Sequence, residues 1–449
     1  MDRFDFDLFV IGGGSGGVRA ARLAAESGAR VALAEAKVLG GTCVNAGCVP
    51  KKLFAYAAGF ADEFADAHGF GWGAAAPPFD WARLIAAKDV EIARLNNAYE
   101  RTLRQAGVEL IFARAAIAGP QRIEVGGRSV SARNVLIATG GAPARPDIAG
   151  RELAFTSDDA FHLPELPGRL LVVGGGYVAA EFASIFAGLG VEVVLAHRGR
   201  RLLKGFDAEL ATRLAAAMAA RGIAIIDAEE LVALDRHGDG ISARFAGGRN
   251  LRADAAMLAT GRAPVTQGLG LDRVGVACAP SGAVTVDATF RASQPWVYAI
   301  GDVIDRVRLT PVALAEAGAV AATLFAARPT ALDYALVPSA VFSRPPLASV
   351  GLSEERARAG GAAVRVYRQA FRPLKGRLSG RTEETLVKLV VDAASDRVLG
   401  AHMLGPEAPE IIQGLAIALT AGATKAHFDA TLGLHPTAAE EFVTLRRQS

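Results

Sequence analysis

The 449-residue chain has few cysteines, little net charge and no long hydrophobic run, and each shortage excludes a class of protein. Three cysteines are too few for the disulfide framework of a small secreted protein. The net charge of +3, from 49 basic and 46 acidic residues, offers no footprint for nucleic acid or an acidic membrane. No stretch approaches the ~20 uninterrupted apolar residues of a membrane span. The acidic run 1–7 lacks the pattern of an export signal. We expect a cytoplasmic, multidomain protein with small-molecule partners.

A glycine-rich segment near the N-terminus is the first motif that is present. An apolar strand pattern over 7–11 leads into Gly-Gly-Gly-Ser-Gly-Gly at 12–17, then an Ala-rich helix and a strand that ends at Glu35. In such a fingerprint the glycines allow a tight turn, close approach of a pyrophosphate and packing of helix on strand. The surrounding strand and helix favour nucleotide binding over a simple glycine-rich helix start.

A second stretch repeats this order of features, which indicates a duplicated unit. A strand pattern over 170–173 leads into Gly-Gly-Gly-Tyr-Val-Ala at 174–179, then a helix through Leu189 and a strand over 192–196. Both copies later close with a glycine-turn hairpin and a strand ending in Ala-Thr-Gly. The sequence therefore predicts an α/β protein with two Rossmann-like domains, each carrying a β-meander insertion.

The ends of the second strands predict different nucleotides at the two sites. An acidic residue there, such as Glu35, accepts hydrogen bonds from ribose hydroxyls, whereas a basic residue suits a 2′-phosphate. The second copy runs into His-Arg-Gly-Arg-Arg at 197–201 and then Lys204, where a carboxylate would select NAD. Arg198 at the strand edge therefore favours NADPH, and a solvated basic loop is the alternative.

The remaining regions differ from this repeat. A mainly helical insertion over 42–107 interrupts the first copy. Residues 296–302 are typical of a buried strand that ends in a Gly-Asp turn, and a helix over 311–327 follows. From Val337 onward, strand patterns alternate with an apolar helix over 410–421, which predicts a separate α+β domain.

Cys43 and Cys48 lie close together in the helical insertion. A regular helix places residues five apart about 7.5 Å along its axis, beyond the ~4.4–6.8 Å between α-carbons that a disulfide tolerates. If the two are bridged, the helix must be deformed, and Gly47 and Pro50 make this plausible. Zinc is the weaker alternative, because Cys278 is the one other cysteine and no histidine has ligand spacing.

Four separated motifs, in order, give the whole chain a resemblance to the flavoprotein disulfide oxidoreductases, which include glutathione reductase, dihydrolipoamide dehydrogenase and mercuric reductase. They are Gly-Gly-Thr-Cys-Val-Asn-Ala-Gly-Cys-Val-Pro-Lys-Lys at 40–52, Ala-Ile-Gly-Asp at 299–302, Leu-Thr-Pro at 309–311 and His-Pro-Thr-Ala-Ala-Glu-Glu at 435–441. The first looks like the glutathione reductase version, since dihydrolipoamide dehydrogenases tend to have Pro-Ser-Lys after the second cysteine.

The resemblance implies a role for each reactive side chain. Cys48 faces the flavin, and Cys43 is the thiolate that attacks substrate and forms a mixed disulfide. His435, arriving from the partner subunit of a homodimer, takes and returns the proton, and Glu440 orients its imidazole. A histidine that titrates near neutrality suits both steps. The remaining implied roles are an ion pair near the flavin, Lys51 with Glu181, and a lid over its ring, Tyr177.

The resemblance also implies the cofactors FAD and NADPH and a domain order. We expect an FAD-binding domain at 1–143, an NADPH-binding domain at 144–264, a central segment at 265–336 that completes the FAD site, and a dimerisation domain at 337–449. The residues expected to bind the two cofactors are Gly12, Gly14, Ser15, Gly17, Glu35, Gly41, Thr42, Lys51, Thr139, Gly140, Asp302, Thr310, Gly174, Gly176, Tyr177, Ala179, Arg198, Lys204, Gly261 and Arg262.

Glutathione disulfide is the substrate that the resemblance favours. Ser15, Arg22 and Tyr99 match positions that contact glutathione in glutathione reductases, although Tyr99 could be a core aromatic of a helix. An arginine that some of them carry shortly after Leu-Thr-Pro-Val-Ala is absent here. The tail has no cysteine, so it lacks the second dithiol of mercuric and large thioredoxin reductases. Cys278 matches nothing catalytic and is interpreted as a small hydrophobic residue.

Three alternatives remain open. One is an NAD-linked dihydrolipoamide dehydrogenase, and another is a reductase of a different low-molecular-weight disulfide. The third is a nucleotide-binding flavoprotein that acts as a sensor or scaffold without turnover. The basic residues at 198 and 204 argue against the first, and the intact reactive side chains argue against the last.

Overall fold

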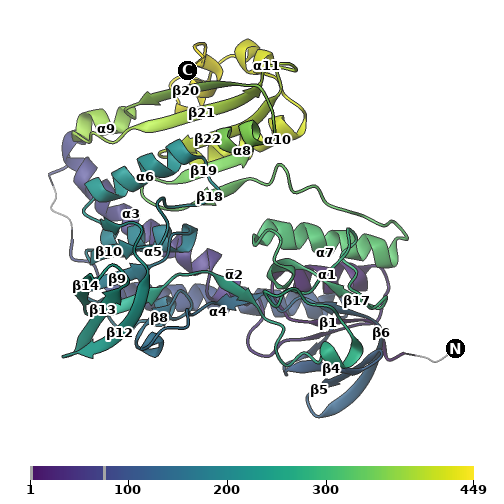
Figure 1. Ribbon diagram of the computed structural model, residues 1–449. Coiled ribbons are helices and arrows are strands. Elements are labelled where there is room, and N and C mark those ends of the chain that lie inside the picture. The colour runs from purple at the N-terminus through teal and green to yellow at the C-terminus, as the bar shows by residue number, and fades with distance from the viewer. Residues whose placement is uncertain (1–3, 74–76, 449) are drawn as a thin grey trace. The chain divides into compact units, whose positions relative to one another are not determined.

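The computed structural model describes residues 4–73 and 77–448 (Figure 1). The start of the acidic N-terminal run, three residues of the helical insertion and the last residue of the tail therefore lie outside the described residues. The chain forms two compact units. Unit 1 comprises Met1–Lys51, Arg83–Ala144 and Gly261–Tyr334, and unit 2 comprises Lys52–Ala82, Arg145–Thr260 and Ala335–Ser449.

Unit 1 is built on a mainly parallel sheet. Its main elements are β1 (Phe6–Ile11), β2 (Val31–Ala34), β3 (Glu109–Ile111), β4 (Ala115–Gly119), β5 (Arg122–Val125), β6 (Arg128–Ile137), β17 (Val297–Ala299), α1 (Ser15–Glu26) and α7 (Thr310–Phe325). The strand order is β3-β2-β1-β6-β5-β4, with β17 parallel to β6. β2 and the ends of β1 and β6 are continuous apolar runs, as expected for parallel strands covered on both faces. α1 and α7 lie side by side (Figure 1).

The predicted meander of the first copy is confirmed. β4, β5 and the start of β6 pair antiparallel, and Gly126 and Gly127 form the β5–β6 turn. A short antiparallel pair, β7 (Gly141–Pro143) with β16 (Arg262–Pro264), follows the two Ala-Thr-Gly strands. This pair brings the closing segments of both copies together within unit 1.

The helical insertion contains α2 (Gly41–Asn45), α3 (Cys48–Ala67) and α4 (Trp81–Gln105). The predicted deformation between the cysteines is confirmed, because α2 ends before Ala46 and α3 begins at Cys48. Ala46 leaves the helical region with φ −147° and ψ 40°. A β-carbon on Gly47 would lie 2.8 Å from the carbonyl oxygen of Thr42, so the break needs glycine there.

Unit 2 contains the second nucleotide-binding sheet. Its elements are β8 (Phe155–Thr156), β9 (Arg169–Val173), β10 (Glu192–Ala196), β11 (Ala224–Ile226), β15 (Ala255–Leu258), α5 (Tyr177–Gly188) and α6 (Ala208–Ala220). The strands are parallel in the order β11-β10-β9-β15-β8. The second meander is also confirmed, as the antiparallel strands β12 (Leu231–His237), β13 (Gly240–Phe245) and β14 (Asn250–Ala253).

The C-terminal part of unit 2 is the predicted α+β arrangement. Five strands form an antiparallel sheet in the order β18-β19-β22-β21-β20. Their bounds and those of the adjoining helices are β18 Ser339–Val341, β19 Leu347–Gly351, β20 Val364–Phe371, β21 Thr385–Asp392, β22 Val398–Leu404, α8 Glu354–Ala359, α9 Leu374–Ser379, α10 Ala408–Thr420, α11 Lys425–Ala430 and α12 Glu441–Thr444. α10 packs on β19 and β22 (Figure 1). The α/β fold class is therefore confirmed.

Cys278 corrects one expectation. A small hydrophobic residue would be buried, but the Cys278 side chain is exposed. It pairs with Val284 in an isolated β-bridge, and Val276 and Val284 already fill the core there. In the described part of the chain, no helix is both long and apolar enough to cross a membrane.

Candidate active site

The cysteine turn, residues 40–48, is shaped by its glycines. Gly40 and Gly41 have positive φ angles of 97° and 58°. A β-carbon on Gly41 would lie 2.6 Å from the α-carbon of Gly14, so the turn packs directly on the first fingerprint. Cys43 thus lies in α2, and Cys48 is the first residue of α3. Both cysteines are free thiols in the structure, without a disulfide.

The two thiols of the turn differ in acidity. A hydrogen bond from Cys43 lowers the pKa of Cys48 to about 6, with help from the Thr310 hydroxyl and the positive charge of Lys51, while burial opposes this shift. The same hydrogen bond, together with burial, raises the pKa of Cys43. The Thr310 Oγ1 lies 3.6 Å from the Cys48 Sγ, although the two residues are 262 positions apart. Cys48 is therefore the more acidic thiol of the pair.

The first fingerprint forms an open cradle at a helix N-terminus. Gly12 has φ 111°, and a β-carbon there would lie 2.4 Å from the Ala138 carbonyl oxygen. A β-carbon on Gly17 would lie 2.0 Å from the Gly12 oxygen, so these two glycines serve the turn itself. Gly14 faces open space, with the nearest atom 3.8 Å away, and caps α1 without a side-chain hydrogen bond. This leaves helix N–H groups and room for a phosphate.

Other residues expected at the first nucleotide site surround this cradle. Glu35 accepts hydrogen bonds from the backbone N–H of Gly13, at 2.8 Å, and of Lys37, at 2.7 Å. The Thr139 hydroxyl donates to the Val265 carbonyl at 2.6 Å, and Gly140 follows it with φ 68°. Arg262 donates through Nη2 to Thr42 Oγ1 at 3.2 Å.

Asp302 lies in the turn after β17. Burial raises the pKa of its carboxyl, and the Arg262 and Arg308 guanidinium groups oppose this. The preceding residue, Gly301, donates its N–H to the buried Glu316 at 2.6 Å, and the Tyr334 hydroxyl donates to the other oxygen of Glu316 at 2.8 Å. Sequence reasoning missed Glu316, because a lone glutamate in an apolar helix carries no motif.

The second fingerprint has the same construction. Gly174 has φ 149°, and a β-carbon there would lie 2.2 Å from the Ala259 carbonyl oxygen and 3.3 Å from the Ala179 side chain. Gly176 has no atom within 4 Å of its β-carbon position, and it caps α5 without a side-chain hydrogen bond. Tyr177, the first residue of α5, is partly exposed. Gly261 has φ 129° and open space beside it.

The basic loop, residues 197–206, follows β10. His197 is buried, with its Nε2 2.6 Å from Asp227, whereas Arg198 and Lys204 point to solvent. Arg198 lies 3.9 Å from Glu230, a loose surface pair that leaves the guanidinium accessible. The loop is tied to the fingerprint by the hydrogen bond from Leu203 N–H to the Gly175 carbonyl, at 2.7 Å.

His435 and Glu440 form the predicted pair in unit 2. The His435 Nδ1 lies 3.0 Å and 3.1 Å from the two carboxylate oxygens of Glu440. The His435 side chain is 80% exposed, whereas that of Glu440 is 19% exposed and also accepts the Thr437 N–H at 3.3 Å. Holding Nδ1 at the carboxylate leaves Nε2 directed away from it, available to a reacting group.

Four further side chains were predicted at the site. Ser15 lies close enough to Cys43 to hydrogen-bond its sulfur. Tyr99 packs partly on the core of unit 1 and is near enough to both cysteines to feel their charge, while burial raises its phenol pKa. Arg22 lies 3.6 Å from Glu26 on α1. Glu181 is buried in α5 and accepts the Phe342 N–H at 2.9 Å.

The comparisons with known proteins agree with this geometry. Residues 6–317 match the model of the family described as pyridine nucleotide-disulphide oxidoreductase, and residues 337–446 match its dimerisation domain. The chain belongs to the pyridine nucleotide-disulphide oxidoreductase family. It is therefore an oxidoreductase.

Individual members of this family are similar to the chain over its full length. It is 53% identical to a glutathione reductase of Burkholderia cepacia, over 100% of both chains. It is 47% identical to the chloroplastic/mitochondrial glutathione reductase of Pisum sativum, over 99% of this chain and 83% of that one. It is 44% identical to a glutathione reductase of a Nostoc strain, over 99% and 100%.

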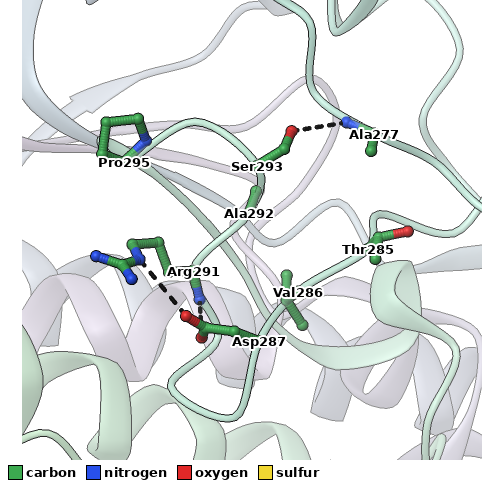
Figure 2. A pocket seen from close by; sticks show the side chains of 8 residues that line it. All are labelled: Ala277, Thr285, Val286, Asp287, Arg291, Ala292, Ser293 and Pro295. Carbon is green, nitrogen blue, oxygen red and sulfur yellow. Dashed lines mark hydrogen bonds and ion pairs between the residues drawn. The ribbon is translucent and has the colours of Figure 1, made fainter.

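An open pocket of about 580 Å³ lies elsewhere in unit 1 and contains no residue of the expected family site. Figure 2 shows its lining, residues 277–295, in which Arg291 turns toward Asp287 and Ser293 accepts the Ala277 N–H at 3.0 Å. Asp287, Arg291 and Ser293 already bond within this lining, so we assign the pocket no ligand. Across residues 4–73 and 77–448, no group of three or more metal-ligating side chains is placed to hold a metal.

Proposed function

We propose that the chain reduces glutathione disulfide with NADPH, through FAD and the Cys43–Cys48 pair. The observation that carries this proposal is the Cys43–Cys48 pair at the cysteine turn, which packs directly on the first nucleotide cradle. In the overall reaction, NADPH, a proton and glutathione disulfide give NADP⁺ and two glutathione molecules. The full-length similarity to three glutathione reductases supports the substrate.

The residues of the first cradle fit FAD. The space at Gly14 and the uncapped N-terminus of α1 suit a pyrophosphate, and Glu35 at the end of β2 suits a ribose. Gly41, Thr42, Thr139, Gly140, Asp302, Thr310 and Lys51 would complete this site. When bound, the flavin would accept hydride from NADPH and deliver an electron pair to the disulfide of the cysteine turn.

NADPH fits the second cradle. The space at Gly176 and the uncapped start of α5 suit its pyrophosphate, and the exposed Arg198 and Lys204 suit its 2′-phosphate. A dihydrolipoamide dehydrogenase linked to NAD would need an acidic residue in place of this basic loop, and is not favoured. Tyr177, the exposed first residue of α5, is the proposed movable lid.

The dithiol then carries out disulfide exchange. Cys43, once deprotonated, attacks one sulfur of glutathione disulfide, so that a Cys43–glutathione bond forms and the disulfide bond breaks. His435 gives a proton to the departing glutathione. The Cys48 thiolate next attacks Cys43, which releases the second glutathione as it takes a proton and restores the Cys43–Cys48 disulfide. Ser15, Arg22 and Tyr99 are the proposed glutathione contacts.

The active chain is a homodimer in this proposal. The 337–449 region would form the subunit interface, and the partner's copy of it would bring the imidazole to the cysteine turn. The 80% exposure of the His435 side chain supports this, because an imidazole fixed by Glu440 but open to solvent is ready to meet another surface. Reduction of a small disulfide with NADPH also suits the reducing cytoplasm, where we place the protein.

A comparison of nucleotides and disulfides tests the function. With the FAD-loaded protein we expect rapid oxidation of NADPH by glutathione disulfide, and much slower oxidation of NADH. The panel of substrates also contains lipoamide, which tests for a dihydrolipoamide dehydrogenase. It further contains γ-glutamyl disulfides other than glutathione disulfide, which test for a reductase of another small disulfide. Strong preference for NADH with lipoamide would overturn the proposal, and inactivity toward every disulfide would favour a sensor.

The Cys43→Ser variant tests the division of labour between the cysteines. It should lose glutathione disulfide reduction, because serine cannot form the mixed disulfide, yet NADPH should still bleach the flavin absorbance. Cys278→Ser is the matched control and should retain activity, since Cys278 is exposed and outside the cysteine turn. Full turnover by Cys43→Ser would contradict the mechanism.

A further inference from the structure

A buried lysine of the C-terminal sheet contacts the end of the basic loop. Lys388 lies on β21, and its side chain is 3% exposed. Its Nζ lies 3.0 Å and 3.1 Å from the two oxygens of Asp207, whose side chain is fully buried. The two residues are 181 positions apart, and Asp207 comes directly after the basic loop. In Figure 1, α6, which begins after Asp207, lies beside β22 of the same sheet as β21.

Asp207 is the point where the basic loop is fastened. Its carboxylate caps α6 by accepting the Glu209 N–H at 3.1 Å. It also accepts the Glu354 N–H at 3.3 Å. Next to it, the Ala208 N–H donates to Glu355 at 3.0 Å. The start of α6 is thus bonded to α8, a helix of the 337–446 region, and the loop ends at a fixed place.

Lys388 contacts two further carboxylates beside Asp207. Besides Asp207, its Nζ lies 2.9 Å from Glu354 and 3.4 Å from Glu209. His402, on the neighbouring strand, is buried and donates through Nε2 to the Leu352 carbonyl at 3.0 Å, and burial lowers its pKa although the charge of Asp207 opposes this. Glu354 and Glu209 also pair with Arg358 and Arg368, each at 3.0 Å. Asp207 is the fully buried carboxylate of the group, and without the Lys388 ammonium it would lose this charged partner.

The first half of the loop is held by other bonds: the Ala228 N–H donates to the Gly199 carbonyl at 2.9 Å, and the Glu229 N–H donates to the His197 carbonyl at 3.1 Å. Lys204 lies in the second half. Leu202 and Leu203 are buried and anchor its middle, with Leu203 bonded to the second fingerprint. Lys204 follows this anchor and Asp207 comes three residues later, so Lys204 lies between two fixed points. A displacement of Asp207 would move Lys204 relative to the phosphate-binding glycines.

We infer that Lys388, acting through Asp207, is a positioning residue for the 2′-phosphate of NADPH. A side chain of the dimerisation region thereby contributes to the preference for NADPH over NADH. The inference rests on the proposed function, in which Arg198 and Lys204 bind the 2′-phosphate. To these two direct contacts the inference adds Lys388, which does not touch the nucleotide itself.

The experiment measures KM and kcat for NADPH and NADH in the FAD-loaded Lys388→Met variant, whose side chain is similar in length but uncharged. KM for NADPH should rise by about tenfold, which corresponds to the loss of one well-placed charged contact. KM for NADH, KM for glutathione disulfide and kcat should change by less than about twofold, since the 2′-phosphate is absent or uninvolved.

Two reference variants distinguish failure of the inference about Lys388 from failure of the proposed nucleotide site. Lys425→Met removes another buried lysine of the same region, whose partners are Asp429 and the Tyr367 ring, and should leave the NADPH-to-NADH ratio unchanged. Arg198→Ala removes a proposed direct contact and should raise KM for NADPH. If Arg198→Ala does so but Lys388→Met does not, or shifts both nucleotides equally, the inference fails and the function stands. If neither variant affects NADPH, the nucleotide assignment itself fails.

A second variant keeps the test decisive if Lys388→Met folds poorly. Asp207→Asn retains an N-cap acceptor for α6 but removes the charge that Lys388 holds. It should raise KM for NADPH in the same direction by a smaller factor, with thermal unfolding measured alongside. An Asp207→Asn protein with the wild-type NADPH-to-NADH ratio would overturn the inference.

Discussion

At the scale of single residues, the two thiols of the cysteine turn differ in acidity. Cys43 and Cys48 belong to the same short segment, yet the pKa of Cys48 falls to about 6 while that of Cys43 rises. Cys48 is therefore the more acidic thiol of the reduced pair. In the proposed mechanism, Cys43 loses its proton before it attacks the substrate, and His435 is the proposed acceptor of that proton.

Thr310 is a residue whose removal should change this balance. In Thr310→Val, Cys48 loses a hydroxyl donor, so its pKa should rise from about 6 by roughly one unit. The thiolate fraction, and with it activity, should fall more at pH 6.5 than at pH 8. A pH titration of thiolate ultraviolet absorbance in the reduced protein, in a Cys278→Ser background, measures the shift.

The conservative variant Thr310→Ser is the control, because it keeps the hydroxyl and should keep the low pKa. An unchanged titration midpoint in Thr310→Val would show that the hydroxyl does not stabilise the thiolate.

At the scale of elements, the two fingerprints use their glycines for two different purposes. Gly12 and Gly174 have positive φ angles and approach a neighbouring carbonyl oxygen, so they build the turn. Gly14 and Gly176 lie in open space at the N-termini of α1 and α5, so a side chain there meets no protein atom at close range. The fold would therefore accept a side chain at Gly14 and Gly176, whereas a bound ligand would need the space that glycine leaves there.

This difference predicts opposite effects of two alanine substitutions. Gly176→Ala should leave the thermal unfolding temperature nearly unchanged but raise KM for NADPH by about tenfold or more, because the methyl group occupies the space of the pyrophosphate. Gly174→Ala should destabilise unit 2 by roughly 1–3 kcal/mol or more, from strain and the clash with Ala259. Unfolding curves and NADPH titrations of both variants measure this.

Similar losses of stability in both variants would contradict the distinction. So would unchanged NADPH binding by Gly176→Ala, since it would place the pyrophosphate elsewhere.

At the scale of the whole molecule, the His435–Glu440 pair and the cysteine turn belong to different units of the chain. In the proposed homodimer each active site takes its cysteines from one subunit and its imidazole from the other. Such sharing allows two inactive variants to complement each other.

Mixing Cys43→Ser with His435→Gln after subunit exchange tests this sharing. Each variant alone should be nearly inactive. A mixed dimer, however, contains one site with intact cysteines and an intact imidazole, so an equal mixture should recover about a quarter of wild-type activity. A mixture that stays inactive after confirmed exchange would show that the site is completed within one subunit.

The sequence by itself determined the parts that depend on local chemistry. The two fingerprints, both meanders and the helix break between Cys43 and Cys48 follow from residue type and spacing, because glycine, alternating apolar residues and short turns limit the backbone directly. The α/β class and the family motifs followed from the same patterns.

Only the tertiary structure decided which groups from distant parts of the chain meet. The Thr310 hydroxyl reaches Cys48, Glu316 holds the turn at Gly301, Lys388 reaches Asp207, and Cys278 is exposed rather than buried. Such contacts join residues separated by up to 262 positions, and no periodicity or spacing encodes them. They depend on how sheets and helices pack, which then sets burial, and burial sets the strength of each charge.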